Sequence, residues 1–344
     1  SKKSSRAKMI ITIITLLGLM LLVYSIRDQI VQTYRDIQRV NIWAIALIPF
    51  ALLLKYHALT QMHRQVLSIF GENIRYRSMF RVQLELNFVN SVFPSGGVTG
   101  ISYFGIRMKD ADVSVGKSTL VQVIKFILLF LSFQILLALG LFLLAIEGQA
   151  NSFLILIAGS LATLLFVGSV LLTYILGSRQ LINKFFKGLS RGVNRVIHVF
   201  RPKNPETISI AKVESTFTDL HENYIQIKNN KRVLKKPLHY ALLSNVAEIV
   251  TLYLVYIAFA AYVNPGAVII AFAIANFAGL ISVLPGGIGI YEGLMTATLV
   301  ASGVPAALSL PVTVMYRIVT SILQLVPGYF YYNKSLQYKH NKSE

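Results

Sequence analysis

The strongest constraint on this chain is a series of apolar runs that are long enough to cross a lipid bilayer. A transmembrane helix needs about 20 mostly apolar residues, because it rises about 1.5 Å per residue through a hydrocarbon core of about 30 Å. Runs of roughly this length occupy residues 9–26, 42–63, 118–146, 152–177, 237–262 and 305–331. Only 14% of the residues are charged, whereas soluble domains carry about 25%. The sequence therefore predicts an all-α polytopic membrane protein with about six full spans.

Two further apolar segments, residues 79–108 and 266–303, are each interrupted by a proline followed by glycines. The two interruptions are near-copies of each other, SVFPSGGV and SVLPGGI, and both residue types are unfavourable inside helices. Residues 79–93 would reach only about 22 Å as a helix, which is less than the hydrocarbon thickness. We therefore predict two re-entrant hairpins of half-helices, broken at Pro94, Ser95, Gly96 and Gly97, and at Pro285, Gly286, Gly287 and Gly289.

The distribution of Lys and Arg predicts the orientation. The chain has 33 of these residues and a net charge of +19. If the N-terminus is cytoplasmic, the outside loops hold only Arg27, Arg35 and Arg39, as the positive-inside rule favours. Both termini are then cytoplasmic, in a multi-pass protein of the cell (plasma or inner) membrane. The two hairpins enter from opposite faces, which is the pattern of an inverted-topology repeat.

This topology makes residues 1–344 a single transmembrane domain. Residues 1–177 form a first half with the hairpin 79–108, residues 237–331 form a second half with the hairpin 266–303, and residues 332–344 form a cytoplasmic tail. Between the halves, 178–236 is a basic segment whose apolar face contains Leu181, Phe185, Leu189 and Val193. We expect either an amphipathic helix on an anionic leaflet or a cap that obeys the positive-inside rule. Nucleic acid is not an expected partner, because topology accounts for the charge.

Ionisable side chains at membrane depth are costly, so they usually line a cavity or pair with one another. Lys125 lies in the third span, Glu248 in the fifth and Arg317 in the last, and the hairpins contain Glu85 and Glu292. The pairs Arg317–Glu292 and Lys125–Glu248 would be purely structural under one interpretation. A polar cavity shared by several spans is the other interpretation.

Further polar residues accompany these charges. Helical spacing places Thr313, Thr320, Ser321 and Gln324 on the face of Arg317. Tyr316 precedes Arg317, and Asn87 approaches the first break. Lys55, His57 and Arg81 have local explanations: Arg81 can snorkel to the interface, and so can Lys55 if its span is shifted. His57 has no second His at metal-binding spacing, and neither a metal nor a cofactor is expected.

The motifs around these residues resemble those of one family. The segment LPGGIGIYEGLMTATLVASGVPAALSLPVTVMYRIVT combines Pro285, Gly286, Gly287, Gly289 and Glu292 with a later Gly-Val-Pro turn and with Tyr316-Arg317. Together with the upstream FPSGGVTGISYFGIRMKD, it resembles the lysylphosphatidylglycerol synthase/flippase-like transmembrane family. That family includes the membrane module of the multiple peptide resistance factors.

The resemblance implies an integral membrane module that is linked to moving aminoacylated phosphatidylglycerol between leaflets. Some members are fused to a cytoplasmic aminoacyl-transferase domain, and others accompany glycan or isoprenoid-lipid pathways. Residues 178–236 and 332–344 are too short to hold such a domain, so we expect a transporter rather than a synthase.

The leading hypothesis is a flippase for a phospholipid or another lipid-phosphate. Arg317 and Lys125 would hold the phosphate, and Glu292, Glu85 and Glu248 would balance them or bind an amine, beside Asn87 and Tyr316. The expected partners are membrane lipids with anionic or lipid-phosphate headgroups. A cytoplasmic lipid synthase is a further candidate partner, and oligomers remain open. The alternatives are an enzyme of a lipid-linked glycan or isoprenoid pathway and a non-transporting subunit that recruits a synthase.

Overall fold

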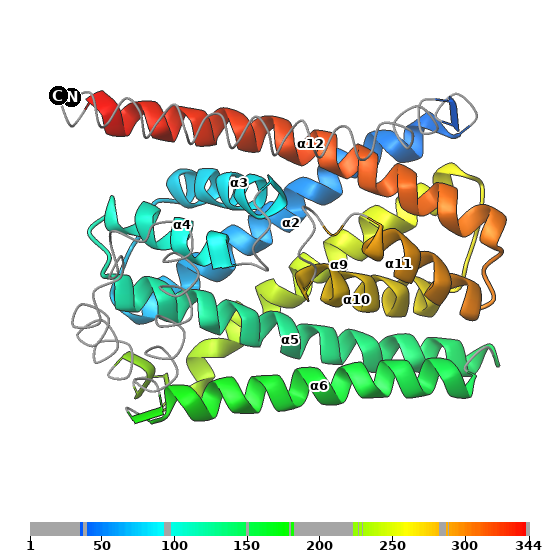
Figure 1. Ribbon diagram of the computed structural model, residues 1–344, viewed down its shortest axis with the longest axis horizontal. Helices are drawn as coiled ribbons and strands as arrows, with labels where there is room; N and C mark the ends of the chain where they lie inside the picture. Colours follow the sequence, from blue (N-terminus) through cyan, green and yellow to red (C-terminus); the bar gives the residue numbers. More distant parts are fainter. Residues whose placement is uncertain are drawn as a thin grey trace, which may run out of the picture.

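The computed structural model describes residues 35–36, 40–92, 98–148, 151–178, 180–181, 223–225, 227–228, 230–281, 287 and 289–341. These residues form helices and connecting turns, with no strand among them. The helices with printed bounds are α2 (Ile42–Ile69), α3 (Tyr76–Val92), α4 (Val98–Lys109), α5 (Val115–Ile146), α6 (Ser152–Leu176), α9 (Lys235–Ala258), α10 (Pro265–Ile281), α11 (Ile290–Ala301) and α12 (Ala306–Asn341) (Figure 1). The 3-10 turn η1 (Lys231–Leu234) leads into α9. The predicted all-α membrane fold is confirmed.

Within the described part of the chain, five helices are long and apolar enough to cross a membrane: Ile42–Ile69, Val115–Ile146, Ser152–Leu176, Lys231–Ala258 and Ala306–Gln337. They correspond to the predicted spans 42–63, 118–146, 152–177, 237–262 and 305–331. The predicted span 9–26 lies outside the described residues, as do most of 178–236 and the end of 332–344.

The fifth predicted span ends earlier than expected. Helix α9 stops at Ala258 rather than at residue 262. Ala260 then adopts a φ of 54°, a left-handed conformation that interrupts a right-handed helix. At the other end, Pro237 lies in the first turn of α9, where the missing N–H leaves no helical hydrogen bond unmade. The helix is therefore displaced towards its N-terminal side.

Short polar side chains determine where several spans begin. The side-chain oxygen of Asn41 accepts a hydrogen bond from the Trp43 amide at the start of α2, and Asn151 does the same for Leu154 at the start of α6. At the start of α5, Ser114 plays this role. Each cap satisfies an amide that the helix itself leaves without a partner.

The two predicted hairpins correspond to two pairs of short helices. Helices α3 and α10 each have 17 residues, and α4 and α11 each have 12. At about 1.5 Å per residue, arms of this size reach roughly 26 and 18 Å, below the hydrocarbon thickness. Figure 1 shows α3 and α4 towards the end of the bundle where α12 ends, and α10 and α11 towards the end where α12 begins. The predicted break residues Pro94, Ser95, Gly96, Gly97, Pro285 and Gly286 lie outside the described residues.

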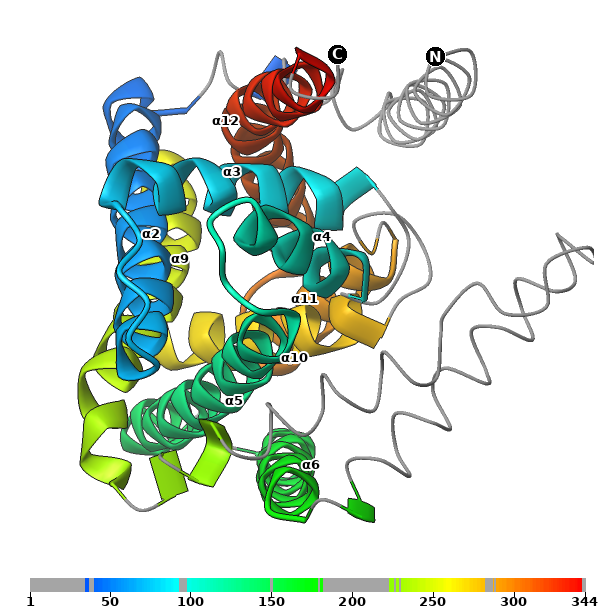
Figure 2. The ribbon, with the colours of Figure 1, turned by 90° about the vertical axis from the view of Figure 1, so that its left-hand side faces the viewer.

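The long helices surround these short pairs. Figure 2 shows α2 and α9 side by side on one flank, with α12 above and α5 and α6 below. Helices α5 and α10 approach closely, because an added Cβ on Gly266 would lie 2.4 Å from the Gly140 carbonyl oxygen. Small residues at such crossings are typical of membrane helices.

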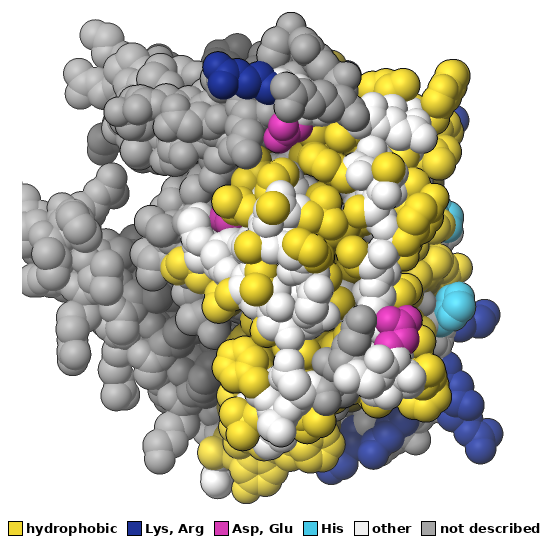
Figure 3. Space-filling model, turned by 90° about the vertical axis from the view of Figure 1, so that its right-hand side faces the viewer, with side chains coloured by type: hydrophobic (Ala, Val, Ile, Leu, Met, Phe, Trp, Pro, Cys, Tyr) yellow, Lys and Arg dark blue, Asp and Glu magenta, His cyan; other side chains and the backbone are white. Residues whose placement is uncertain are grey.

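Large apolar side chains cover much of the outer surface. Trp43 is 78% exposed, Leu156 68% and Phe142 62%, which suits contact with lipid tails. Figure 3 shows the end of the bundle that carries the α5–α6 turn, where hydrophobic and uncharged side chains predominate among the described residues.

Candidate functional site: a polar pocket inside the helical bundle

A polar pocket of about 250 Å³ lies where the short helices α3, α10 and α11 meet the long ones. Its walls are formed by residues of α2, α3, α9, α10, α11 and α12. The lining residues are Lys55, Asn87, Ser91, Glu248, Asn276, Tyr291, Tyr316, Arg317, Thr320, Ser321, Gln324 and Leu325. The pocket is thus surrounded by groups that can bind ions and donate or accept hydrogen bonds.

One part of the wall is an ion pair between two long helices. Lys55 Nζ lies 2.6 Å from Glu248 Oε1, and the Tyr316 hydroxyl donates to the same oxygen at 3.2 Å. Gln324 Oε1 accepts from Lys55 Nζ at 3.5 Å and from the Tyr56 hydroxyl at 3.1 Å. This network joins α2, α9 and α12. It supplies the partners that charges need in a medium of low dielectric constant.

A second ion pair surrounds Arg317. Its Nε lies 3.4 Å from Glu292 Oε1, and its guanidinium carbon lies 4.5 Å from the centre of the Tyr291 ring. A cation above an aromatic face is stabilised by the quadrupole of the ring. The Arg317 side chain is 18% exposed, so part of its guanidinium faces the pocket.

Glu292 also organises the helix that carries it. Its Oε2 accepts a hydrogen bond from the Gly289 amide at 2.7 Å, and Gly289 has a φ of 85° that glycine adopts without strain. The carboxylate therefore lies at the N-terminus of α11, where the helix dipole favours negative charge. Gly287, with a φ of 66°, belongs to the same turn. The glycine-rich motif thus places Glu292 against both α11 and Arg317.

The structure brings together several of the residues that the sequence singles out. Arg317, Glu248, Asn87 and Tyr316 line the pocket, and Glu292 reaches it through its ion pair with Arg317.

Lys125 and Glu85 do not belong to this pocket. Glu248 pairs with Lys55 rather than with Lys125, and Lys125 Nζ instead lies 4.4 Å from the centre of the Phe126 ring. The reason is packing: Lys55 on α2 faces α9, the helix against which α2 packs along most of its length. Helical periodicity identifies the polar face of a helix but not the helix that faces it.

Glu85 belongs to a second cavity of about 340 Å³ between α3, α4 and the last part of α12. Its carboxylate lies 2.7 Å from Arg107 Nε, and it also accepts a hydrogen bond from the Tyr103 hydroxyl at 2.8 Å. Arg107 in turn lies 3.2 Å from Asp110. The Glu85–Arg107 pair was not predicted, because the two residues lie on opposite sides of the break.

The pocket residues that were not among the predicted site residues include Lys55, Asn276 and Tyr291. Lys55 carried a usable signal, because it is a charge inside a span. Its ability to snorkel obscured that signal. Asn276 and Tyr291 carried weaker signals, as single polar or aromatic residues in the second hairpin.

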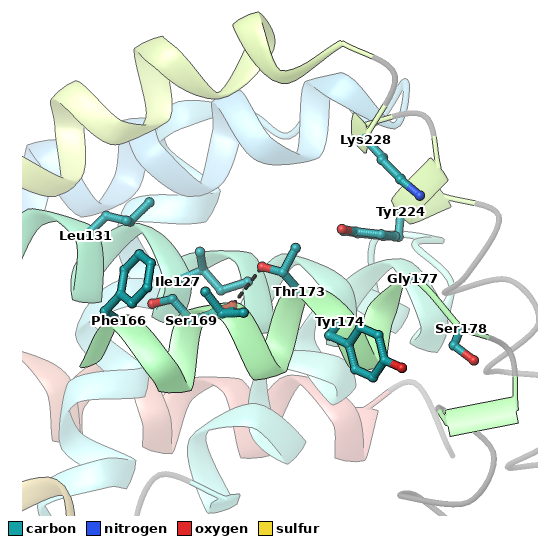
Figure 4. A pocket seen from close by; sticks show the side chains of 11 residues that line it. Ile127, Leu131, Phe166, Ser169, Thr173, Tyr174, Gly177, Ser178, Tyr224 and Lys228 are labelled. Carbon is teal, nitrogen blue, oxygen red and sulfur yellow. Dashed lines mark hydrogen bonds between the residues drawn. The ribbon is translucent and has the colours of Figure 1, made fainter. Parts of the chain in front are cut away.

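A third cavity, of about 550 Å³, lies between α5, α6 and the segment around residues 224–228 (Figure 4). Ile127, Leu131 and Phe166 form apolar walls. The Ser169 and Thr173 hydroxyls donate to carbonyls of their own helix, which leaves them little capacity for a ligand. This cavity is therefore less suited to a charged headgroup than the polar pocket.

Among the described residues, no cluster of His, Asp or Glu has the composition of a metal site. The chemistry available in the polar pocket is that of two ion pairs, surrounded by amide and hydroxyl groups.

Comparisons with known proteins match this chain to a membrane-protein family. The model of the family described as the lysylphosphatidylglycerol synthase TM region matches residues 9–328. A UPF0104 membrane protein of Methanothermobacter thermautotrophicus is 41% identical over 80 residues, which cover 23% of this chain and 24% of that protein. A UPF0104 membrane protein of Pyrococcus horikoshii is 26% identical over 128 residues, which cover 36% of this chain and 38% of that protein. The matched stretches thus span well under half of these curated relatives.

Proposed function

The chain belongs to the family of the lysylphosphatidylglycerol synthase TM region, and from this premise we propose that it moves a lipid with a phosphate-bearing headgroup between membrane leaflets. The observation that carries the proposal is the polar pocket with two ion pairs, Lys55–Glu248 and Arg317–Glu292. The headgroup enters this pocket while its acyl chains stay in the bilayer. Aminoacylated phosphatidylglycerol is one substrate of this class.

The charges of the pocket suit such a headgroup. Arg317 and Lys55 are the cations that would receive a phosphate, with Arg317 able to donate two parallel hydrogen bonds. Glu248 and Glu292 are the carboxylates that would receive an amine. The four charges sum to zero, so a headgroup that carries both a phosphate and an amine meets a partner for each group.

The ion pairs also suggest how the pocket exchanges its own contacts for those of a substrate. If a phosphate draws Arg317 away, Glu292 retains its hydrogen bond from the Gly289 amide. If a phosphate draws Lys55 away, Glu248 retains the Tyr316 hydroxyl. Neither carboxylate is left buried without a partner, which would otherwise oppose binding.

The arrangement of the short helices supports alternating access. We propose that α3–α4 and α10–α11 are re-entrant hairpins related by an inverted-topology repeat. Their arms match in length, 17 and 12 residues in each pair, and the pairs lie towards opposite ends of the bundle (Figure 1). Rocking of one hairpin against the other would open the pocket to each leaflet in turn.

The orientation follows from charge. Arg75, Arg77, Lys109 and Lys117 lie near the ends of α3, α4 and α5 that share one end of the bundle. At the opposite end, the described residues of the α5–α6, α9–α10 and α11–α12 turns include no Lys or Arg. The positive-inside rule then places the end with α3 and α4 in the cytoplasm, with both termini on that side of the cell membrane. We propose a transporter rather than a synthase, since the pocket places paired charges where a headgroup can bind.

A flipping assay tests the proposal. The protein is reconstituted in vesicles of phosphatidylcholine with a fluorescent phosphatidylglycerol, and the fraction of probe that dithionite cannot reach is followed over time. We expect wild type to exchange the probe and Arg317→Ala to lose at least about tenfold in rate, which corresponds to about 1.4 kcal/mol. Arg77→Ala, on an exposed residue outside the pocket, is the matched control. Equal rates for wild type and a folded Arg317→Ala variant would remove the role assigned to the pocket.

A further inference from the structure

The cavity of about 340 Å³ between α3, α4 and the last part of α12 has no role in the pocket described above. We propose that it is a second anion site, where the phosphate of a lipid headgroup rests before or after it occupies the polar pocket. This inference rests on the proposed lipid transport. It assigns a ligand class to Arg81 and Lys334, which line this cavity and lie outside the polar pocket.

The two cavities lie in line along one helix–helix contact. On α12, residues 316–325 line the polar pocket and residues 331–335 line the second cavity. On α3, Asn87 and Ser91 line the polar pocket, whereas residues 78–85 line the second cavity. Because α3 and α12 run in opposite directions, the lining residues on the two helices place the cavities in the same order along the bundle. From Leu325 to Tyr331, the helix rise separates them by roughly 9 Å.

The second cavity carries cations that are available to a ligand. Arg107 is already neutralised, because Glu85 and Asp110 both bind it. In the part of the chain that the structure describes, no ion pair joins Arg81 or Lys334 to a carboxylate. The Arg81 guanidinium carbon lies 5.7 Å from the centre of the Tyr331 ring. The aromatic contact orients the guanidinium and leaves its N–H groups free to donate hydrogen bonds to phosphate oxygens.

An apolar constriction separates the two cavities. An added Cβ on Gly328 would lie 2.8 Å from both the Leu84 carbonyl oxygen and the Phe88 Cβ, so the backbones of α12 and α3 are in close contact there. Phe88 is fully buried, and its ring centre lies 5.2 Å from that of Tyr332. A phosphate cannot pass this contact while α3 and α12 remain packed. The second cavity therefore holds the headgroup on one side of a closed contact, and separation of α3 from α12 connects the two sites.

A photo-crosslinking experiment tests the site. A photoreactive phosphatidylglycerol, at low mole fraction in phosphatidylcholine vesicles, labels the reconstituted full chain, and the labelled peptides are mapped. We expect label on residues 78–85 and 331–335 in wild type. In the double variant Arg81→Gln/Lys334→Gln, we expect that label to fall at least about fivefold while label on residues 316–325 persists. The matched control is Arg77→Gln/Lys109→Gln, which removes two exposed cations of the same end and should label as wild type.

Two further measurements separate a lipid site from a free-phosphate site and this inference from the proposed function. Inorganic phosphate at tens of millimolar should not displace the label; displacement would show that the site takes free phosphate and would overturn the lipid assignment. Undiminished label in the double variant would also overturn the inference. Transport is measured on the same vesicles. If Arg317→Ala alone abolishes flipping while the double variant labels normally, this inference fails and the proposed function stands. If wild type labels both regions but does not flip, the proposed function fails and the second site stands.

Discussion

Lys55 on α2 and Glu248 on α9 form an ion pair of 2.6 Å although 193 positions separate them in the chain. This pair connects the two helices that lie side by side on one flank of the bundle and forms part of the pocket wall. Its position makes it a structural contact, and the proposed function would make it a binding element as well.

The first prediction concerns the stability of the Lys55–Glu248 pair. Lys55→Met and Glu248→Leu, made singly, should each lower the free energy of unfolding by about 1.5–3 kcal/mol, because each leaves the remaining charge with neutral hydrogen-bond partners only. The double variant should recover most of that loss. The measurement is thermal unfolding in detergent of four proteins: the wild type, the two single variants and the double variant. Additive losses would mean that the two charges are not coupled in the membrane protein.

Two variants at Glu292 should distinguish its role in folding from its role in transport. Glu292→Gln keeps an acceptor for the Gly289 amide and removes the charge that faces Arg317, whose guanidinium keeps its contact with the Tyr291 ring, so stability should fall less than in Glu292→Ala while flipping falls. Glu292→Ala removes the cap as well, and should cost about 1 kcal/mol more. Unfolding temperature and flipping rate are measured on both variants. Normal flipping by Glu292→Gln would show that the charge serves the fold alone.

Gly328 should report on the contact between α3 and α12. Gly328→Ala places a Cβ 2.8 Å from a backbone oxygen that cannot move aside, and such overpacking costs about 1–3 kcal/mol. Gly105→Ala, in α4, is the matched control: no atom lies within 4 Å of its added Cβ, so the better helix propensity should stabilise it by about 0.5–1 kcal/mol. Opposite signs in an unfolding assay are expected. Equal effects would show that α3 and α12 do not touch at this position.

Single cysteines test the proposed hairpins, since the native chain contains none. Asn73→Cys precedes α3 and Lys109→Cys ends α4. If α3–α4 is a re-entrant hairpin, a membrane-impermeant maleimide should reach both from the same side. Glu147→Cys and Tyr262→Cys should react from the other side. Labelling of Asn73→Cys and Lys109→Cys from opposite sides would mean that α3 and α4 together cross the membrane.

The sequence by itself determined the spans. Long apolar runs leave a helix as the only way to satisfy the backbone inside a bilayer, so the spans could be placed to within a few residues at most ends. The C-terminal ends of three helices were the exceptions. Helices α2 and α12 continue to Ile69 and Asn341, beyond the predicted ends at 63 and 331, and α9 stops at Ala258 instead of 262. The early end of α9 was not predicted because the left-handed Ala260 that follows it is an alanine and carries no turn signal. The short arms were likewise foreseeable from Pro and Gly, whose effect on a helix is local.

The partners of the buried charges were decided by the tertiary structure. Periodicity placed Arg317, Thr320 and Gln324 on one helix face, but it could not tell that Lys55 rather than Lys125 meets Glu248. That choice depends on which helices pack together, and several packings satisfy the same local pattern. Glu85 illustrates the same limit, since its partner Arg107 lies on α4, and the packing of α4 against α3 brings the two residues together. Local chemistry thus defined the elements and their polar faces, whereas the packing of distant helices defined the site.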